Sequence, residues 1–443
     1  MSAEHPQLVR SIRLLAHLLL ALPTAALFPT GISPTIQDPL TNPPRTFCPV
    51  AQDGATSNTF PWTVTPTCFK GVLPNEKEDH GHVGIHEQFC VFTNSFFRGN
   101  RGISLVTMPE VAAELPYASF EPFELSISSA TPFLQTHVEG KGEGLIATKE
   151  IGEGDSLMLK SPVLFVHKDV LKTPCRHRRH VLLEKAVEQL PEKTKQALKP
   201  LSRVGDEYEV EDMININAMN AEAWEGSGHL IVVPEAARIN HACRPNAYYR
   251  FDDTALNLDV FAMTNIKAGE ELTFSYGFSH LPHDSRMEAL QAAWGFTCTC
   301  PLCTANSTSQ STSNARLQQI SEIKSVLPTS PSSMPQLLGL LPDLISLLEA
   351  EDLIRELPMY EEIMAYTWSS FGIEDRARMW AGRAAKHWSI VAGMESWEVK
   401  RMRDMERDVR GHGTWLGWDG EDPWEGVGKG HPWDEHEKHD HGH

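Results

Sequence analysis

The stretch Arg238-Ile239-Asn240-His241-Ala242-Cys243-Arg244-Pro245-Asn246 decides the fold of this chain, together with two segments that follow it. The first is Gly269-Glu270-Glu271-Leu272-Thr273-Phe274-Ser275-Tyr276-Gly277, and the second is Trp294-Gly295-Phe296-Thr297-Cys298-Thr299-Cys300-Pro301-Leu302-Cys303. Between them the three segments hold four of the eight cysteines of the chain. This concentration of thiols, amides and aromatic rings predicts that the functional site lies in these segments.

The closely spaced cysteines predict a metal site. Cys298, Cys300 and Cys303 supply three thiol groups at short spacing, and Cys243 is the remaining cysteine in this part of the chain. A structural zinc ion takes four ligands in tetrahedral geometry, and thiolates are among its preferred ligands. The alternatives are a cluster of buried thiols or disulfides, and the spacing favours zinc over both.

The order Asn-His-x-Cys-x-Pro-Asn, Gly-Glu-Glu-Leu-x-x-x-Tyr and Cys-x-Cys-x-x-Cys resembles the catalytic core of SET-domain protein methyltransferases. Those enzymes transfer a methyl group from S-adenosylmethionine (SAM) to a lysine side chain. The resemblance covers about residues 123–303 and is strongest to SET and MYND-type and fungal SET domain-containing proteins. It implies an α+β fold, in which a β-rich SET domain with an inserted helical segment and a post-SET zinc site precedes an all-α C-terminal region.

The resemblance also implies which residues bind the cofactor and the metal. One structural zinc ion would be held by Cys243 together with the three later cysteines. The residues that match cofactor-binding positions of the family are Lys141, Gly142, Glu143, Asn217, Asn240, His241 and Phe296. Simpler interpretations exist for some of them: the glycine segment is also a common turn, and an aromatic ring such as Phe296 also packs in a core.

Tyr276 is the predicted catalytic residue. On a strand, Leu272, Phe274 and Tyr276 point to the same side, so the phenol ends an apolar face. The resemblance places it where a lysine channel meets the methyl group of SAM, with Tyr248 and Tyr249 as further channel candidates. Positioning and desolvation of a neutral amine supply most of the rate in such a reaction. The alternative role is that of a buried structural tyrosine.

Composition bears on partners and compartment. With 39 Lys and Arg against 58 Asp and Glu, the net charge is −19, which disfavours direct nucleic-acid binding. Arg10 and Arg13 precede a short apolar run, and residues 1–26 are predicted to be a signal peptide, with an amphipathic or disordered leader as the alternative. The apolar run is too short to span a membrane. The leader favours the secretory pathway, whereas the family resemblance favours nucleus or cytoplasm.

Segment boundaries follow from composition and periodicity. Residues 27–122 form a region containing many Pro and three Cys residues, which is expected to be irregular as far as Pro74. The family resemblance implies a SET domain at residues 123–280. Cys48, Cys68, Cys90 and Cys175 would form two disulfides in an oxidising compartment or remain thiols in a reducing one. The insertion at about residues 167–212 has too few cysteines for a MYND zinc finger.

The C-terminal half is predicted from helical periodicity. Residues 281–305 are the post-SET zinc segment, whose helix is expected to begin with a capping box at Ser285-x-x-Glu288 and to end at Gly295. The Ser- and Thr-rich residues 306–316 read as a linker, residues 317–409 as a helical domain, and residues 410–443 as a disordered tail rich in His and acidic residues.

Two functions are compatible with these features. The first is a SAM-dependent protein-lysine methyltransferase, whose partner is a protein substrate carrying a lysine. The second is a secreted or lumenal protein that keeps the SET scaffold for interaction without turnover. Neither requires direct contact with nucleic acid or a membrane span, and the oligomeric state is left open.

Overall fold

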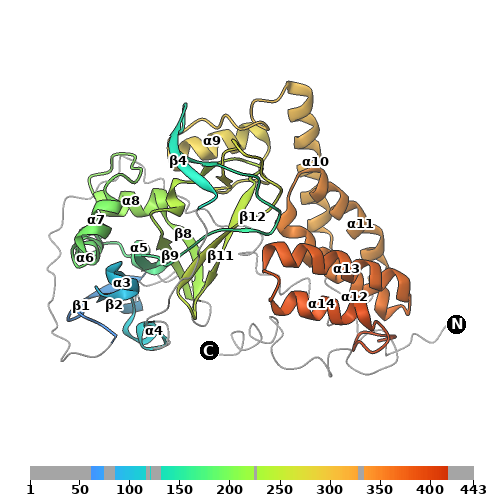
Figure 1. Ribbon diagram of the computed structural model, residues 1–443, viewed down its shortest axis with the longest axis horizontal. Helices are drawn as coiled ribbons and strands as arrows, with labels where there is room; N and C mark the ends of the chain where they lie inside the picture. The colour runs from blue at the N-terminus through green and yellow to red at the C-terminus, as the bar shows by residue number, and fades with distance from the viewer. Residues whose placement is uncertain are drawn as a thin grey trace, which may run out of the picture.

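The computed structural model describes residues 61–73, 85–115, 120, 131–223, 227–327 and 334–417. The predicted leader at residues 1–26, Cys48 and the tail beyond residue 417 lie outside them. The fold is α+β, as predicted: a β-rich part with inserted helices lies beside an all-helical C-terminal part (Figure 1). Among the described helices, none combines the length and the apolar character that a membrane crossing requires.

The largest sheet has six strands, in the order β1-β2-β3-β7-β9-β8. Only the pair β3 and β7 is parallel, and the other neighbouring strands run antiparallel. In chain order the strands are β1 (Thr67–Leu73), β2 (Ile85–Asn94), β3 (Ile103–Thr107), β7 (Leu164–His167), β8 (Met219–Ala223) and β9 (Ser227–Val232).

Three smaller sheets build the region around the predicted site. They are β11-β12-β6, β10-β13 and β4-β5, and the pair β10-β13 is parallel. The strands are β4 (Phe133–Val138), β5 (Gly142–Ala147), β6 (Ser156–Lys160), β10 (Asn240–His241), β11 (Ala247–Asp252), β12 (Asn257–Ala262) and β13 (Thr273–Phe274). Because β10 pairs with β13, the Asn-His segment and the segment before Tyr276 lie side by side.

Alternation along the central strand β7 separates two cores. Phe165 packs with Leu258 and Val260 of the three-stranded sheet, whereas Leu164 and Val166 pack with the helices of the insertion. This follows from the strand period of two, which sends successive side chains to opposite faces. The insertion helices are α5 (Lys168–Lys172), α6 (Arg176–Glu188), α7 (Glu192–Leu198) and α8 (Glu209–Asn217).

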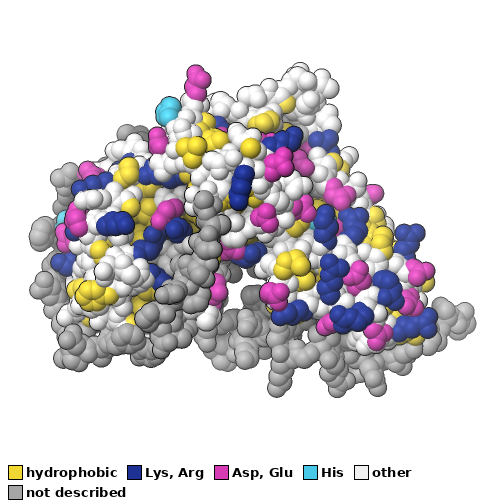
Figure 2. All heavy atoms as spheres, in the orientation of Figure 1, with side chains coloured by type: hydrophobic (Ala, Val, Ile, Leu, Met, Phe, Trp, Pro, Cys, Tyr) yellow, Lys and Arg dark blue, Asp and Glu magenta, His cyan; other side chains and the backbone are white. Residues whose placement is uncertain are grey.

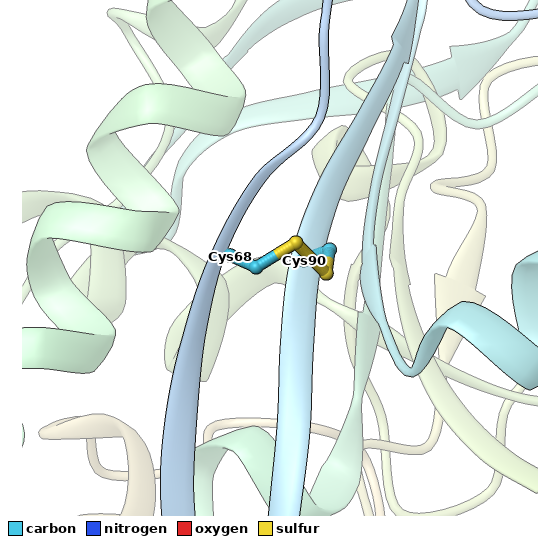
Figure 3. The surroundings of a disulfide bond; sticks show 2 residues. All are labelled: Cys68 and Cys90. Atoms are coloured by element: carbon cyan, nitrogen blue, oxygen red, sulfur yellow. A yellow bond between two sulfur atoms is a disulfide. The ribbon is translucent and has the colours of Figure 1, made fainter. Parts of the chain in front are cut away.

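The N-terminal region is more ordered than its composition predicts. Its strand β1 falls within the segment expected to be irregular, and β1 to β3 extend the sheet that holds β7. Short helices α3 (Phe97–Asn100) and α4 (Pro109–Ala113) accompany these strands. Cys68 and Cys90 face each other across β1 and β2 and form a disulfide (Figure 3), and Cys175 is also disulfide-bonded. Cross-strand pairing and the disulfide outweigh the irregular-chain signal of the prolines.

The prediction of a linker at residues 306–316 is wrong, because the helix α10 spans Ser307–Ser325. The side chain of Asn306 accepts a hydrogen bond from Ser309 N at 2.9 Å, which caps the helix. Further along, Leu317 and Ile320 are buried in the core of the helical part. Capping and burial therefore override the weak helix propensity of Ser and Thr.

The helical part also extends beyond the predicted end at residue 409. It consists of α10, α11 (Met334–Ala350), η4 (Ile354–Glu356), α12 (Leu357–Ser370), α13 (Glu374–Val391) and α14 (Trp397–Arg407). Residues 410–417 were assigned to a disordered tail, yet Thr414 is fully buried and its hydroxyl bonds to that of Ser369. Lys and Arg side chains gather over this part (Figure 2), and several pair with acidic neighbours, as Arg383 does with Glu349 and Glu361.

The helix α9 (His283–Trp294), which leads to the three closely spaced cysteines, ends as predicted but begins earlier. Gly295 adopts the left-handed conformation with φ 74° and closes the helix. The predicted capping box is wrong, because the N-cap is Pro282 and makes no side-chain cap. Instead the backbone N–H of His283 donates to Asn314 of α10 at 2.8 Å, so a tertiary contact satisfies the first turn.

The cap of α10 gives a test of the corrected boundary. Replacing Asn306 with Ala should lower the free energy of opening the first turn by about 1 kcal/mol. Hydrogen exchange at residues 307–311 should then be about fivefold faster. Asn306→Asp is the matched control, because it keeps an acceptor and, like Asn306→Ala, removes the glycosylation sequon Asn306-Ser307-Thr308. Equal exchange in both variants would show that the cap contributes nothing.

Candidate active site

A cavity of about 380 Å³ lies where the three signature segments meet. Its walls come from the turn before β5, the end of α8, the segment from η2 (Ala236–Arg238) into β10, the residues after β13 and the chain after α9. The structure thus brings together the residues predicted to bind the cofactor and the predicted catalytic residue. Those lining the cavity are Lys141, Gly142, Glu143, Asn217, Asn240, His241, Tyr276 and Phe296.

Asn240 is held in place by a carboxylate that the sequence analysis did not single out. Its side-chain nitrogen donates to Glu271 Oε1 at 2.9 Å and to the carbonyl of Glu143 at 3.2 Å. The other oxygen of Glu271 forms an ion pair with Lys141 Nζ at 2.6 Å. One carboxylate therefore joins the glycine turn to the Asn-His segment, and its place in the Gly-Glu-Glu motif was the available signal.

Gly144 is required by this close approach. A Cβ atom at this position would lie 2.7 Å from Val138 Cγ2, 2.8 Å from Asn240 Nδ2 and 3.1 Å from Glu271 Oε1. All three distances are shorter than ordinary van der Waals contact, so a larger residue must displace the Val138 methyl group, the Asn240 amide and its carboxylate partner. The second glycine of the Gly-Glu-Gly segment, which lies in β5, therefore allows close packing against Val138, Asn240 and Glu271.

His241 couples the predicted catalytic segment to the cysteine cluster. Its Nδ1 accepts a hydrogen bond from Tyr276 N at 3.0 Å, and its Nε2 lies 3.4 Å from Cys243 Sγ. Because Nδ1 accepts, we assign the ring proton to Nε2, which then donates to the sulfur. Burial lowers the pKa of His241 to about 4, so the ring is neutral. Both ring nitrogens are thus used within the protein, and the side chain organises the site.

Tyr276 is buried and fixed by its neighbours. Its hydroxyl donates to the carbonyl of Ile239 at 2.9 Å, which orients the phenol in the cavity wall. Burial, with a smaller contribution from the carboxylate of Glu271, raises the pKa of Tyr276 well above its ordinary value. The phenol is therefore neutral, and its oxygen retains lone pairs that can accept a further hydrogen bond.

Other aromatic side chains share the wall with Tyr276. Tyr248 and Tyr249, which the sequence could not orient, both line the cavity, and their rings stack at 4.8 Å. Tyr249 accepts a hydrogen bond from Asn220 N at 3.1 Å. Trp294 lies with its ring 5.5 Å from that of Tyr276. The sequence alone gives Trp294 no role in the site, because its position in the quoted segment does not show that its ring lies beside Tyr276.

Asn217 lines the cavity at the end of α8, with its side chain already engaged. The amide nitrogen donates to the carbonyls of Ser202 and Met213 at 2.8 and 2.7 Å, and the oxygen accepts from Ser202 N at 3.3 Å. These bonds tie the loop after α7 to the end of α8 and leave the side chain little freedom. Its position agrees with the prediction, while its contacts are those of a residue that shapes the wall.

Four buried thiols gather beside the cavity. Cys243, Cys298, Cys300 and Cys303 have sulfur atoms that all lie within 4.8 Å of one another, close enough to hold one metal ion. The guanidinium of Arg286, which is 1% exposed, approaches Cys303 Sγ at 4.0 Å. Burial alone would lower the pKa of Arg286, but the neighbouring thiolates raise it. A buried cation at this place offsets negative charge on the sulfurs.

Comparison with known proteins agrees with this geometry. Residues 142–277 match the SET domain family. These residues are a SET domain. It holds the glycine turn, Asn240 and Tyr276, while the cysteines after residue 277 lie beyond the match.

Several curated proteins are similar over part of the SET-containing chain. "Histone-lysine N-methyltransferase set5" of Schizosaccharomyces pombe is 24% identical over 210 residues, which are 46% of this chain and 56% of that protein. "N-lysine methyltransferase SMYD2" of Homo sapiens is 36% identical over 93 residues, which are 20% of this chain and 21% of that protein. The chain thus spans little more than half of the first relative and about a fifth of the second.

Gly144 provides a test of the site's packing. We expect Gly144→Ala to lower the free energy of unfolding by about 1–3 kcal/mol, because the added methyl group pushes on Asn240 and Glu271. A lower thermal midpoint in calorimetry would report this. Gly339→Ala is the matched control: it lies on the exposed face of α11 with no atom within 4 Å of the added Cβ, and should leave stability unchanged or raise it. Equal midpoints for both variants would contradict the packing argument.

Proposed function

We propose that this chain is a SAM-dependent protein-lysine N-methyltransferase. The observation that carries the proposal is the convergence of Asn240, Tyr276 and the aromatic wall on one cavity within a SET domain. The names of the curated relatives support the same reaction class. The predicted partner is a protein with an accessible lysine side chain.

The cavity fits SAM in its chemistry. Its volume of about 380 Å³ lies within the range of small-molecule sites. Among the described residues, no donor bonds to the side-chain oxygen of Asn240, so this acceptor can serve an ammonium group. Phe296 and Trp294 offer flat apolar surfaces for a heterocycle. We assign cofactor contacts to Lys141, Gly142, Glu143, Asn217, Asn240, His241 and Phe296, with Asn217 and His241 acting mainly through the shape of the wall.

Bound SAM would supply a methyl group already activated by its sulfonium. The chain must then present a neutral lysine amine in line with the S–CH₃ bond, so that an N–CH₃ bond forms while the sulfur keeps the electron pair. Tyr248, Tyr249 and Phe274 exclude water from the amine, and desolvation favours its neutral form. Tyr276 is the proposed catalytic residue, since its oxygen can accept from the amine N–H and orient the lone pair.

The cysteine cluster is proposed to hold one structural zinc ion. Cys243, Cys298, Cys300 and Cys303 supply four sulfur ligands, which leave no open coordination position for catalysis. Arg286 and the Nε2–H of His241 lie close enough to offset or hydrogen-bond the thiolates. The ion would therefore fix the post-SET segment against the Asn240 segment and contribute indirectly to the cofactor wall.

A second candidate function is a secreted or lumenal scaffold protein without turnover. The disulfide between Cys68 and Cys90 favours an oxidising compartment, as does the predicted signal peptide at residues 1–26. Mass spectrometry of the culture medium and of the cells separates the alternatives. Only intracellular chain that still begins at Met1 would remove the secretory support.

Tyr276→Phe tests the proposed reaction. The phenol oxygen is lost while the ring remains, so transfer of labelled methyl groups from SAM to protein lysines should fall on the order of tenfold to a hundredfold. SAM binding measured by calorimetry should stay nearly unchanged in this variant and be lost in Asn240→Ala. Unchanged methyl transfer by Tyr276→Phe would refute the catalytic assignment. A folded wild-type protein that does not bind SAM would refute the proposed function.

Cys300→Ser tests the zinc assignment. We expect zinc content, measured by elemental analysis, to fall from about one ion per chain to well below half of that, because one of four thiolate ligands is gone. Thr299→Ser is the control, since this exposed neighbour lies between two ligands and should leave the metal bound. Equal zinc content in both variants, or none in the wild type, would contradict the site.

A further inference from the structure

The connection between α11 and α12 contacts the β-rich part that contains the SET domain, here called the SET part, at three places. Glu351 follows α11, and Arg355 and Glu356 belong to η4. Each of these three side chains contacts a different segment next to the candidate active site. This connection is therefore one of the places where the helical part reaches the site, besides the packing of Ile390 against Tyr248, although the SET match ends well before it.

Glu351 is the most buried of these contacts. It is 3% exposed, and its carboxylate forms ion pairs with Arg244 of the SET part and with Arg316 of α10, the latter at 2.6 Å. The hydroxyl of Ser313 adds a hydrogen bond at 2.8 Å. Two cations and a hydroxyl share one buried carboxylate, so removing its charge leaves them without compensation.

Arg244 lies inside the signature segment, directly after the proposed zinc ligand Cys243. Its guanidinium donates to the carbonyl of Cys243 at 2.8 Å and to that of Ser279 at 3.1 Å, besides pairing with Glu351. One side chain thus joins the Asn240 segment, the chain just after Tyr276 and the helical part. A planar guanidinium with five donors suits such a role, and a lysine does not.

Two further contacts lie next to the ion pair between Glu351 and Arg244. Glu356 accepts from His280 at 2.5 Å and from Lys324 of α10 at 2.5 Å. The guanidinium of Arg355 lies 3.5 Å from the ring centre of Tyr248, which stacks on Tyr249 in the cavity wall. Both contacts hold the same connection against the segment after Tyr276 and against the wall.

We propose that Glu351 is a positioning residue for the cofactor site. It fixes Arg244, and Arg244 fixes the backbone of the segment that carries Asn240 and Cys243. The inference rests on the proposed function only for its ligand, SAM. It makes the helical part a component of the site, so that the SET match alone does not contain all the residues that order the cavity.

Glu351→Gln tests this inference, with Glu349→Gln as the matched control. Both change a glutamate in or next to the end of α11 to its amide, but Glu349 is partly exposed and pairs with Arg383, which belongs to the helical part. In full-length, zinc-loaded protein, Glu351→Gln should speed hydrogen exchange in residues 240–247 at least about fivefold and weaken SAM binding at least about fivefold. The control should change neither by more than about twofold.

If the Glu351→Gln variant does not fold, Arg244→Lys tests the same positioning role. It retains the charge but cannot bridge Glu351 and two carbonyls together, so the same two effects are expected at smaller size. Folded variants with wild-type exchange and wild-type SAM affinity would overturn the proposal, as would faster exchange that is uniform over the chain. If the wild type does not bind SAM, the proposed function fails, while the exchange comparison still decides the positioning role.

Discussion

The gathering of four buried sulfur atoms is the constraint on which the site depends. It brings Cys243 to the three cysteines after α9, and so places Phe296 and Trp294 against the Asn240 segment. His241 links the cysteine cluster to Tyr276, because its two ring nitrogens contact Cys243 and the backbone of Tyr276. A shift of the cluster would therefore move the proposed cofactor wall and Tyr276, the proposed catalytic residue, together.

Buried and partly buried carboxylates fix the remaining parts of the site. Glu271 joins the glycine turn to Asn240, and Glu351 joins the signature segment to the helical part. Asp212 accepts backbone hydrogen bonds from Val204, Gly205 and Asp206, which shapes the loop behind the cavity. The chain is acidic overall, yet these carboxylates lie largely inside and organise loops. Local partners, which composition does not reveal, decide what an acidic residue does.

The fold class and the site could be predicted because their residues stand in short, ordered motifs. Cys298, Cys300 and Cys303 show their spacing directly, and Gly295 marks a helix end by its conformational freedom. The helix α10 could not be predicted, since its Ser and Thr residues are stabilised by a cap and by burial against distant helices. The contacts of Glu351 and Arg355 could not be predicted either. Their contacts join residues about a hundred positions apart, and no local pattern reports such pairs.

The functional unit is consequently longer than the segment that matches the SET family. Lys141 lies just before residues 142–277, and Trp294, Phe296 and three of the four cysteines follow them. Strands β1 to β3 complete the sheet that supports β7, and Glu351 anchors the loop that carries Asn240. Each of these additional residues and strands covers atoms of the matched segment that would otherwise be exposed to water. A fragment limited to the match would thus expose buried polar groups and lose the geometry of the cavity.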